Sequence, residues 1–197
     1  MDITNHIVLI GKQGSGKTSL AKALGNVGFT RVISCTTRPR RSNEINGADY
    51  SFLTDEAFNA IAGDLAAVRS YETIYGEWRY GIDLRDINAD GPTVCILDPN
   101  GYLEIRDEIK DRFAIYLDLP RDIRINRVLA RGDDPEEVAR REEDDEIMFG
   151  YLDARYQELC DLRIARERSI EDDVARIQRY LRAFNDGSIN YDGRPGE

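Results

Sequence analysis

Histidine is almost absent from this chain of 197 residues, which contains only His6. Histidine is the usual general base of Ser- and Cys-dependent hydrolases and a frequent ligand of zinc. With a single copy we expect no His-based metal centre, no Ser-His-Asp triad and no Cys-His dyad. Any chemistry must come from other side chains.

Cysteines and long apolar runs are also scarce. Cys35, Cys95 and Cys160 are odd in number and far apart, so they match neither a zinc-binding pattern nor a disulfide framework. We interpret them as unmodified thiols of a reducing compartment. No run reaches the roughly 18 apolar residues of a membrane span, and no basic segment precedes the short run Ile7–Ile10. We therefore expect a cytoplasmic protein with neither a membrane span nor a secretion signal.

Positive charge is in the minority, because 27 Lys and Arg face 37 Asp and Glu and the net charge is −10. Such a chain repels phosphate backbones, so we expect no nucleic acid among its partners. An anionic ligand would need a local cluster of cations. Only four of the basic residues are lysines, and Lys12, Lys17 and Lys22 all lie in or beside one glycine-rich segment.

The length suits one compact domain with small insertions. Apolar runs rich in β-branched and aromatic residues predict buried strands, and they alternate with helical segments, which is typical of a parallel α/β sheet. The five predicted strands are Ile7–Ile10, Arg31–Cys35, Pro92–Leu97, Phe113–Leu117 and Leu162–Ala165.

One long segment interrupts this alternation. Residues 36–85 are polar and Arg-rich at first and Tyr-rich later, with a helix predicted to begin after Thr54. The aromatic stretch Tyr71–Tyr80, broken by Gly76, predicts strands. We expect an inserted lobe with a small sheet of its own.

Charged helices are predicted towards the end of the chain. Pro135 opens an acidic helix, in which seven of the eleven residues Glu136–Glu146 are Asp or Glu, and we interpret these as a solvated face. Ser169 is predicted to cap a last amphipathic helix that ends near Phe184. Residues 185–197 are predicted to form a mobile tail.

The segment Gly11-Lys12-Gln13-Gly14-Ser15-Gly16-Lys17-Thr18 satisfies G-x-x-x-x-G-K-[ST] between a predicted strand and a predicted helix. Glycines let successive backbone N–H groups surround phosphate oxygens, and the helix N-terminus adds its dipole. Lys17 supplies a charge to the β- and γ-phosphates, and the Thr18 hydroxyl can reach Mg²⁺. The motif therefore predicts a P-loop that binds a nucleoside triphosphate.

Asp98 follows the predicted strand at Pro92–Leu97. P-loop proteins place a carboxylate at this point that helps to hold magnesium, so Thr18 and Asp98 are candidate metal ligands. The alternative is that Asp98 only caps the helix that follows.

A second group of cations lies in the predicted lobe. The guanidinium forks of Arg38 and Arg41 match phosphate oxygens bidentately, and Tyr50 adds a directional donor. The alternative is that these arginines pair with the abundant acidic residues. Two phosphate sites in one domain suggest phosphoryl transfer between two bound nucleotides. Arginines that fit a closing lid, or alternatively a helix surface, are Arg127, Arg131, Arg140 and Arg141.

With these motifs the sequence resembles the guanylate kinases over roughly residues 5–184. The resemblance is carried by the P-loop, Ser34-x-Thr36-Thr37-Arg38-x-x-Arg41-x-x-Glu44-x-Asn46-Gly47-x-Asp49-Tyr50-x-Phe52, Tyr80-Gly81, Ile96-Leu97-Asp98 and Arg131-Gly132-x-x-x-Glu136-Glu137. It implies an α/β fold: a P-loop NTPase core with a five-stranded parallel sheet, an inserted NMP-binding lobe with a small mixed sheet, and a helical lid. The corresponding division is a core of residues 1–35, 86–125 and 155–184, a lobe of residues 36–85 and a lid of residues 126–154.

The resemblance also implies an activity: Mg²⁺-dependent transfer of a phosphoryl group from ATP to GMP or dGMP, by a monomer or homodimer. The residues that it assigns to ATP are Gly11, Gly14, Ser15, Gly16, Lys17, Thr18 and Ser19. Those that it assigns to the acceptor are Ser34, Arg38, Arg41, Tyr50 and Tyr80. The catalytic residues that it implies are Lys17, Arg131, Arg140 and Arg141.

Three positions on the guanine side depart from the family pattern. The family carries a glutamate in the inserted sheet, and Glu72 is the only carboxylate in that stretch here. Ile82 replaces a Ser or Thr, and Asn100, two residues after Asp98, replaces a frequent second Asp. Glu72, Asp98 and Asn100 complete the candidate acceptor-binding residues.

These departures leave two alternatives open. Each unpaired polar edge of a buried base costs about 1–3 kcal/mol, so the same fold could serve a deoxypyrimidine or modified nucleoside monophosphate, or a sugar phosphate. A guanylate-kinase-like module that binds a partner without catalysis is the other alternative. Such modules typically lose the P-loop lysine, which is present here as Lys17.

Overall fold

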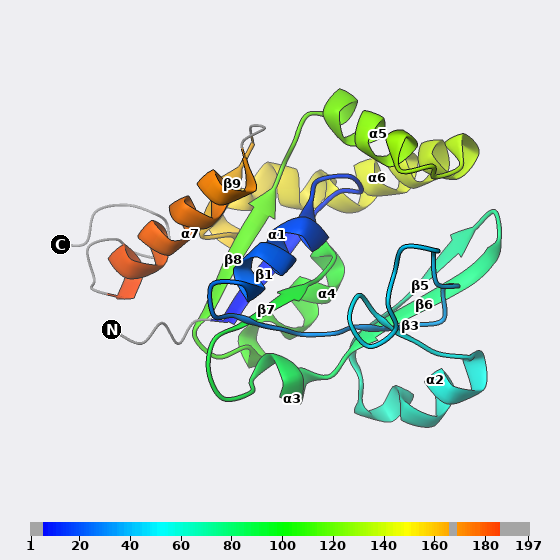
Figure 1. Cartoon of the computed structure of the whole chain (residues 1–197), viewed down its shortest axis with the longest axis horizontal. Coiled ribbons are helices and arrows are strands. Elements are labelled where there is room, and N and C mark those ends of the chain that lie inside the picture. Colours follow the sequence, from blue (N-terminus) through cyan, green and yellow to red (C-terminus); the bar gives the residue numbers. More distant parts are fainter. Residues whose placement is uncertain (1–5, 166–168, 186–197) are drawn as a thin grey trace.

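The computed structural model describes residues 6–165 and 169–185, so most of the predicted tail, residues 186–197, lies outside the described residues. A five-stranded sheet has the order β2-β7-β1-β8-β9, with every neighbouring pair parallel (Figure 1). This confirms the predicted parallel α/β core. Its strands are β1 (His6–Gly11), β2 (Thr30–Arg31), β7 (Thr93–Ile96), β8 (Arg112–Leu117) and β9 (Leu162–Ile164).

Helices cover both faces of this sheet, so every residue of the central strand β1 is buried. That is why its sequence is a continuous apolar run and does not alternate. Helices α1 (Lys17–Gly25) and α7 (Ile170–Asn185) pack on the face that holds Ile7 and Leu9. Helices α4 (Pro99–Ile105) and α6 (Pro135–Leu159) pack on the opposite face. The predicted Ser169 cap is confirmed, because its Oγ accepts a hydrogen bond from the Asp172 N–H at 3.1 Å.

A second, four-stranded sheet has the order β4-β3-β6-β5 and lies beside the core (Figure 1). It is mixed, because β3 runs parallel to β4 and antiparallel to β6. The predicted cap of α2 is also confirmed, since the Thr54 Oγ1 accepts the Ala57 N–H at 3.2 Å. The elements of this region are β3 (Cys35–Thr36), β4 (Ser51–Phe52), α2 (Asp55–Ile61), the 3-10 turn Ala62–Asp64, β5 (Ala66–Thr73), β6 (Gly76–Ile82) and α3 (Leu84–Ile87).

The predicted single strand Arg31–Cys35 is wrong. Strand β2 ends at Arg31 in the core sheet, and β3 begins at Cys35 in the second sheet. The Val32 N–H still bonds to the Val94 carbonyl at 2.9 Å, and the chain then crosses to the other sheet. The segment contains no Gly or Pro to mark the crossing, so periodicity alone could not reveal it.

Helices α5 (Arg121–Ala130) and α6 extend beyond the edge of the core in Figure 1. A 3-10 turn at Arg106–Glu108 precedes β8, and α5 leads into α6, which has a non-helical residue at Arg155. Asp134 caps α6 by accepting hydrogen bonds from the backbone N–H groups of its first turn.

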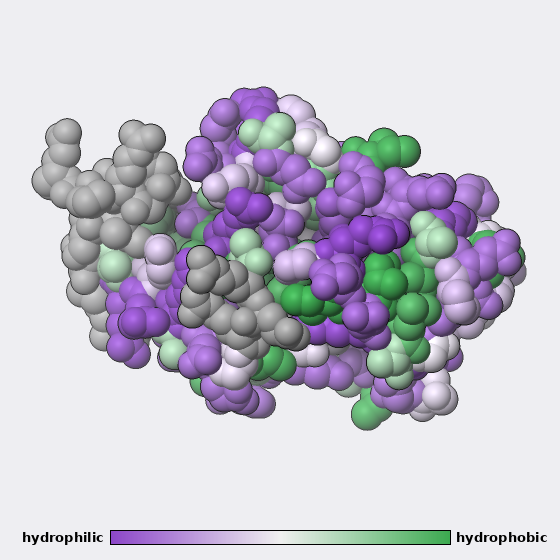
Figure 2. All heavy atoms as spheres, turned by 90° about the horizontal axis from the view of Figure 1, so that it is seen from above, coloured by the Kyte–Doolittle hydropathy of each residue, from purple (hydrophilic) through white to green (hydrophobic). Residues whose placement is uncertain are grey.

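The face seen in Figure 2 is largely hydrophilic, with hydrophobic side chains in smaller patches. None of the described helices combines the length and the apolar character needed to cross a membrane.

Candidate active site

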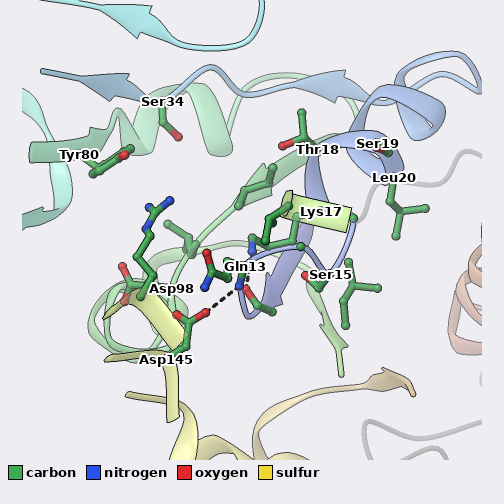
Figure 3. A pocket seen from close by; sticks show the side chains of 18 of the residues that line it. Gln13, Ser15, Lys17, Thr18, Ser19, Leu20, Ser34, Tyr80, Asp98 and Asp145 are labelled. Atoms are coloured by element: carbon green, nitrogen blue, oxygen red, sulfur yellow. Dashed lines mark hydrogen bonds between the residues drawn. The ribbon is translucent and has the colours of Figure 1, made fainter. Parts of the chain in front are cut away.

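One large cavity, of about 670 Å³, lies between the core sheet, the second sheet and helix α6. The parallel pairing of β1 with β7 brings the P-loop and Asp98 to the same edge of the sheet. Figure 3 shows Ser34 and Tyr80 on one side of the cavity and Ser15, Ser19 and Leu20 on the other, with Lys17 between them. The predicted site residues that line it are Gly11, Gly14, Ser15, Gly16, Lys17, Thr18, Ser19, Ser34, Arg38, Arg41, Tyr50, Tyr80, Asp98, Arg131, Arg140 and Arg141.

The P-loop needs its glycines. Gly14 has a φ of 72°, and a Cβ there would stand 2.3 Å from the Arg124 carbonyl oxygen. Gly16, with a φ of 92°, stands directly before α1 and turns the chain into the helix. A side chain at either position would be strained, so the close turn around the cavity depends on glycine.

Lys17 is folded back onto its own loop. Its Nζ donates to the carbonyl oxygens of Gly11 and Lys12, the latter at 3.0 Å. Burial lowers the pKa of Lys17 to about 8, although the Asp145 carboxylate acts in the opposite direction. A triphosphate entering the loop would offer this ammonium stronger, charged acceptors than the two carbonyls.

Carboxylates of α6 hold the P-loop from the other side. The Asp145 Oδ2 accepts the Gln13 backbone N–H at 2.7 Å (Figure 3). The Lys12 ammonium pairs with Glu146 at 3.0 Å and with Asp153 at 3.3 Å. These contacts, which sequence reasoning missed, anchor the helix of the predicted lid directly to the loop.

The interpretation of Glu136–Glu146 as a solvated face is therefore wrong for part of that segment. Glu137 and Glu142 are 6% and 3% exposed. Glu142 forms two hydrogen bonds with the buried Arg124 of α5, at 2.8 and 2.6 Å. Arg124 also donates to the carbonyl oxygen of Gln13 at 3.3 Å, so the pair supports the P-loop from behind.

The arginines that follow β3 form a second cationic group, in which Arg38 is buried and Arg41 is partly exposed. Arg38 is only 4% exposed and stacks over the rings of Tyr50 and Phe52, with 5.4 Å from its guanidinium carbon to each ring centre. Glu44 accepts hydrogen bonds from both nitrogen ends of the Arg38 guanidinium, at 2.8 and 3.0 Å, and also pairs with Arg41 at 3.4 Å. Pairing with acids, the alternative considered for these arginines, does occur, but it happens inside the cavity and orients them towards it.

Arginines of α5, of α6 and of the turn between them also line the cavity. Arg131 bonds to Asp133, and Arg140 bonds to Glu137 at 2.9 Å. Arg127 also lines the cavity. Its Nη1 lies close to the P-loop, 3.5 Å from the position that a Cβ on Gly16 would take. The cavity thus holds cations from three separate parts of the chain.

Asp98 does cap α4, since its Oδ1 accepts the Gly101 N–H at 2.8 Å. Its Oδ2 accepts the Tyr71 hydroxyl at 2.9 Å. Both oxygens therefore have protein donors while the side chain lines the cavity. Over the residues that the structure describes, no group of three His, Cys, Asp or Glu side chains is arranged to hold a metal ion.

Comparison with known proteins decides the family. The Guanylate kinase family model matches residues 3–184. The chain belongs to the guanylate kinase family. It is 31% identical to the guanylate kinase of Thermotoga maritima, with 90% of this chain and 92% of that protein covered, and 30% identical to that of Salinibacter ruber, with 90% and 97% covered. The predicted resemblance is confirmed, and the chain is an enzyme of the nucleoside monophosphate kinase class.

Solved structures agree on the fold. The crystal structure of guanylate kinase from Anaplasma phagocytophilum matches with a TM-score of 0.62 and 20% identity, over 93% of this chain and 87% of that one. This similarity supports the arrangement of the sheets and helices.

Two residues proposed for the acceptor lie elsewhere. Glu72 is exposed, and in the strand register its backbone lies opposite Glu77. Its side chain is on the other face of β5 from that of its neighbour Tyr71. Asn100 is exposed on α4. Neither belongs to the lining of the cavity, so the structure separates both from the other candidate residues.

Tyr71 takes the place on β5 that faces the cavity, and sequence reasoning missed it. A β-bulge between Ala66 and Arg69 is the cause. Ala66 pairs with Ile82 but Arg69 pairs with Tyr80, so β5 holds one extra residue there. Because a shift of one residue exchanges the two faces of a strand, the bulge turns Tyr71 inward and Glu72 outward.

Proposed function

We propose that this protein transfers a phosphoryl group from ATP to GMP, giving ADP and GDP. The observation that carries the proposal is that one cavity contains both a P-loop and a separate group formed by the buried Arg38 and the partly exposed Arg41 and Tyr50. The names of the relatives, guanylate kinases of bacteria, supply the identity of the substrates. The division into a core, a lobe of residues 36–85 and a lid of residues 126–154 is part of the proposal.

The two anion sites suggest how the reactants would be arranged. The N–H groups of the P-loop and Lys17 would bind the phosphates of ATP, and Arg38 and Arg41 would bind the phosphate of the acceptor. Arg131, Arg140 and Arg141 would neutralise charge on the transferred group from the lid side. Phosphoryl transfer needs alignment and electrostatic stabilisation and no covalent intermediate, and this set of cations is suited to it.

Magnesium fits this site on the evidence of the side chains present. Thr18, in the first turn of α1, lines the cavity with an exposed side chain, and its hydroxyl is the ligand that the motif provides. Magnesium retains waters and uses few protein ligands when it binds nucleotide phosphates, so a dense carboxylate cluster is not required. When bound, the ion would neutralise phosphate charge. Asp98, whose oxygens already accept two hydrogen bonds, would act on it through water.

The test is a coupled assay of ADP release with ATP, Mg²⁺ and a panel of monophosphates: GMP, dGMP, AMP, dUMP, dTMP and dCMP. We expect selective turnover of GMP or dGMP, and loss of turnover when Mg²⁺ is chelated. Lys17→Ala should abolish turnover. Selective turnover of another monophosphate, or no turnover of any monophosphate in the panel, would contradict the proposed acceptor. If the wild type is inactive and Lys17→Ala leaves ligand binding unchanged, a binding module is favoured.

A further inference from the structure

A line of aromatic rings leads from the cationic group of the lobe to Asp98. The ring centres of Tyr50 and Tyr80 are 6.0 Å apart, and those of Tyr80 and Tyr71 are 5.7 Å apart, both in edge-to-face arrangements. Arg38 stacks on Tyr50 at one end, and the Tyr71 hydroxyl reaches Asp98 at the other. A monophosphate whose phosphate contacts Arg38 would therefore extend its flat base along Tyr80 towards Tyr71 and Asp98.

Apart from Tyr71 and Asp98, the Ser34 hydroxyl lines the cavity on the side of Tyr80 (Figure 3). Ile82 and Ala67 also line the cavity, and both are buried and apolar. Glu72 faces the other side of the hairpin because of the bulge. Tyr71 and Asp98 supply adjacent oxygen acceptors at this end. Their mutual hydrogen bond holds them together, and Arg69, which does not line the cavity, lies with its Nε 3.9 Å from the Asp98 Oδ1.

Hydrogen bonding fixes what these two side chains can offer. The Tyr71 hydroxyl donates its proton to the Asp98 Oδ2 at 2.9 Å, which leaves the phenolic oxygen only as an acceptor. The Asp98 carboxylate has acceptor sites beyond the two that Tyr71 and the Gly101 N–H occupy. The pair therefore presents oxygen lone pairs and no donor.

We propose that Tyr71 and Asp98 together form an acceptor-only surface that reads the N–H edge of the acceptor base, which makes Tyr71 a specificity-determining residue. The inference rests on the proposed function and deepens it. Guanine presents two adjacent donor groups, N1–H and the 2-amino group. Hypoxanthine presents only N1–H, and adenine presents an unprotonated N1 that would face the lone pairs without a proton between them. A base with two adjacent N–H groups is the class that this surface selects.

The experiment compares GMP with inosine monophosphate in the wild type and in Tyr71→Phe. The substitution keeps the ring and removes one acceptor. GMP then has one N–H without a partner, whereas the single N–H of inosine monophosphate can still use Asp98. We expect the KM for GMP to rise about tenfold, and the ratio of kcat/KM between the two substrates to fall by about the same factor, with kcat and the KM for ATP little changed.

Tyr75→Phe is the matched control, because Tyr75 lies at the tip of the same hairpin and is 60% exposed. We expect it to leave every parameter at the wild-type value. An unchanged KM for GMP, or an unchanged substrate ratio, in Tyr71→Phe would overturn the inference. An unchanged KM for ATP shows that the variant is folded, and titration of GMP without ATP should show the same loss of affinity.

The failure of the inference and the failure of the proposed function are distinguishable. If the wild type does not phosphorylate GMP, the proposed function is wrong before any variant is made. If it phosphorylates GMP and Tyr71→Phe retains the wild-type substrate ratio, the function stands and the role of Tyr71 is wrong.

Discussion

Arg41, between β3 and β4, and Asp133, between α5 and α6, form an ion pair with 3.4 Å from Nη2 to Oδ2. The Asp133 carboxylate also accepts two hydrogen bonds from Arg131. Although burial alone would raise it, these two arginines hold the pKa of Asp133 below its ordinary value, so the group is charged at neutral pH. Asp133 thus occupies two guanidinium groups that the proposed function assigns to phosphates.

Asp133→Asn is expected to strengthen acceptor binding, because the incoming phosphate no longer competes with a carboxylate for Arg41. A partly buried ion pair is worth about 1 kcal/mol, so the KM for GMP should fall about three- to tenfold. The measurement is the KM for GMP at saturating ATP. Asp107→Asn is the control, since Asp107 is 80% exposed and also lies near arginines. A higher KM in Asp133→Asn would show that the pair organises the site and does not compete with substrate.

The buried pair of Arg124 and Glu142 predicts a large effect on stability. Both side chains are almost fully buried, at 3% and 4% exposure, and removing one partner leaves the other charge without compensation. Glu142→Gln should lower the free energy of unfolding in urea by about 3–5 kcal/mol. Glu143→Gln, at the exposed neighbouring position, should change it by less than about 0.5 kcal/mol. A small effect at position 142 would mean that relaxation or water replaces the ion pair.

The parts of this molecule that sequence reasoning predicted are those whose information is local. The P-loop is such a case, because one short segment with three glycines and the start of one helix contain its backbone donors. The core strands β1, β7 and β8 are another, since burial on both faces produces continuous apolar runs such as Ile7–Ile10. Caps such as Thr54 also depend on neighbouring residues alone.

Features that depend on distant segments could not be predicted in this way. The inward direction of Glu142 depends on Arg124, which belongs to another helix. The choice between Tyr71 and Glu72 depends on one extra residue in β5, near Ala67, whose φ of 49° is unusual for a residue other than glycine. Ala66 of β5 pairs with Ile82 of β6, and strict alternation from Ala66 along β5 would place Glu72 on the same face as Ala66. The extra residue in β5 moves Glu72 to the opposite face and Tyr71 to the cavity.

Asp161 predicts a pH dependence of stability. Burial raises its pKa from 3.8 to about 6, although it accepts the Ala114 N–H at 2.7 Å. Between these values the folded protein binds more protons at this site than the unfolded chain, so stability falls as pH rises from about 4 to 6. Asp161→Asn removes this contribution. We expect the difference in the free energy of unfolding, variant minus wild type, to increase by about 2–3 kcal/mol between pH 4 and pH 7. Urea unfolding of both proteins at the two pH values measures it, and parallel curves would contradict the raised pKa.

Lys17 predicts a pH dependence of ATP binding. Its pKa of about 8 in the free protein means that the ammonium loses its proton within an accessible range. Below pH 8 the charged form is available to phosphate, and above it each pH unit removes about nine-tenths of that form. The dissociation constant for ATP should therefore rise between pH 8 and 9.5, by up to about tenfold per unit.

Lys17→Arg provides the comparison, because a guanidinium keeps its charge throughout this range. The variant is expected to bind ATP more weakly, since a fork does not fit where an ammonium contacts the Lys12 carbonyl at 3.0 Å, but with a flat profile from pH 7.5 to 9.5. ATP itself is fully ionised across that interval, so its own titration does not add a slope. If the wild type and the variant weakened in parallel, the titrating group would lie elsewhere in the site. A flat wild-type profile would mean that burial does not lower the pKa of Lys17, and the loop would then bind phosphate with a permanently charged lysine.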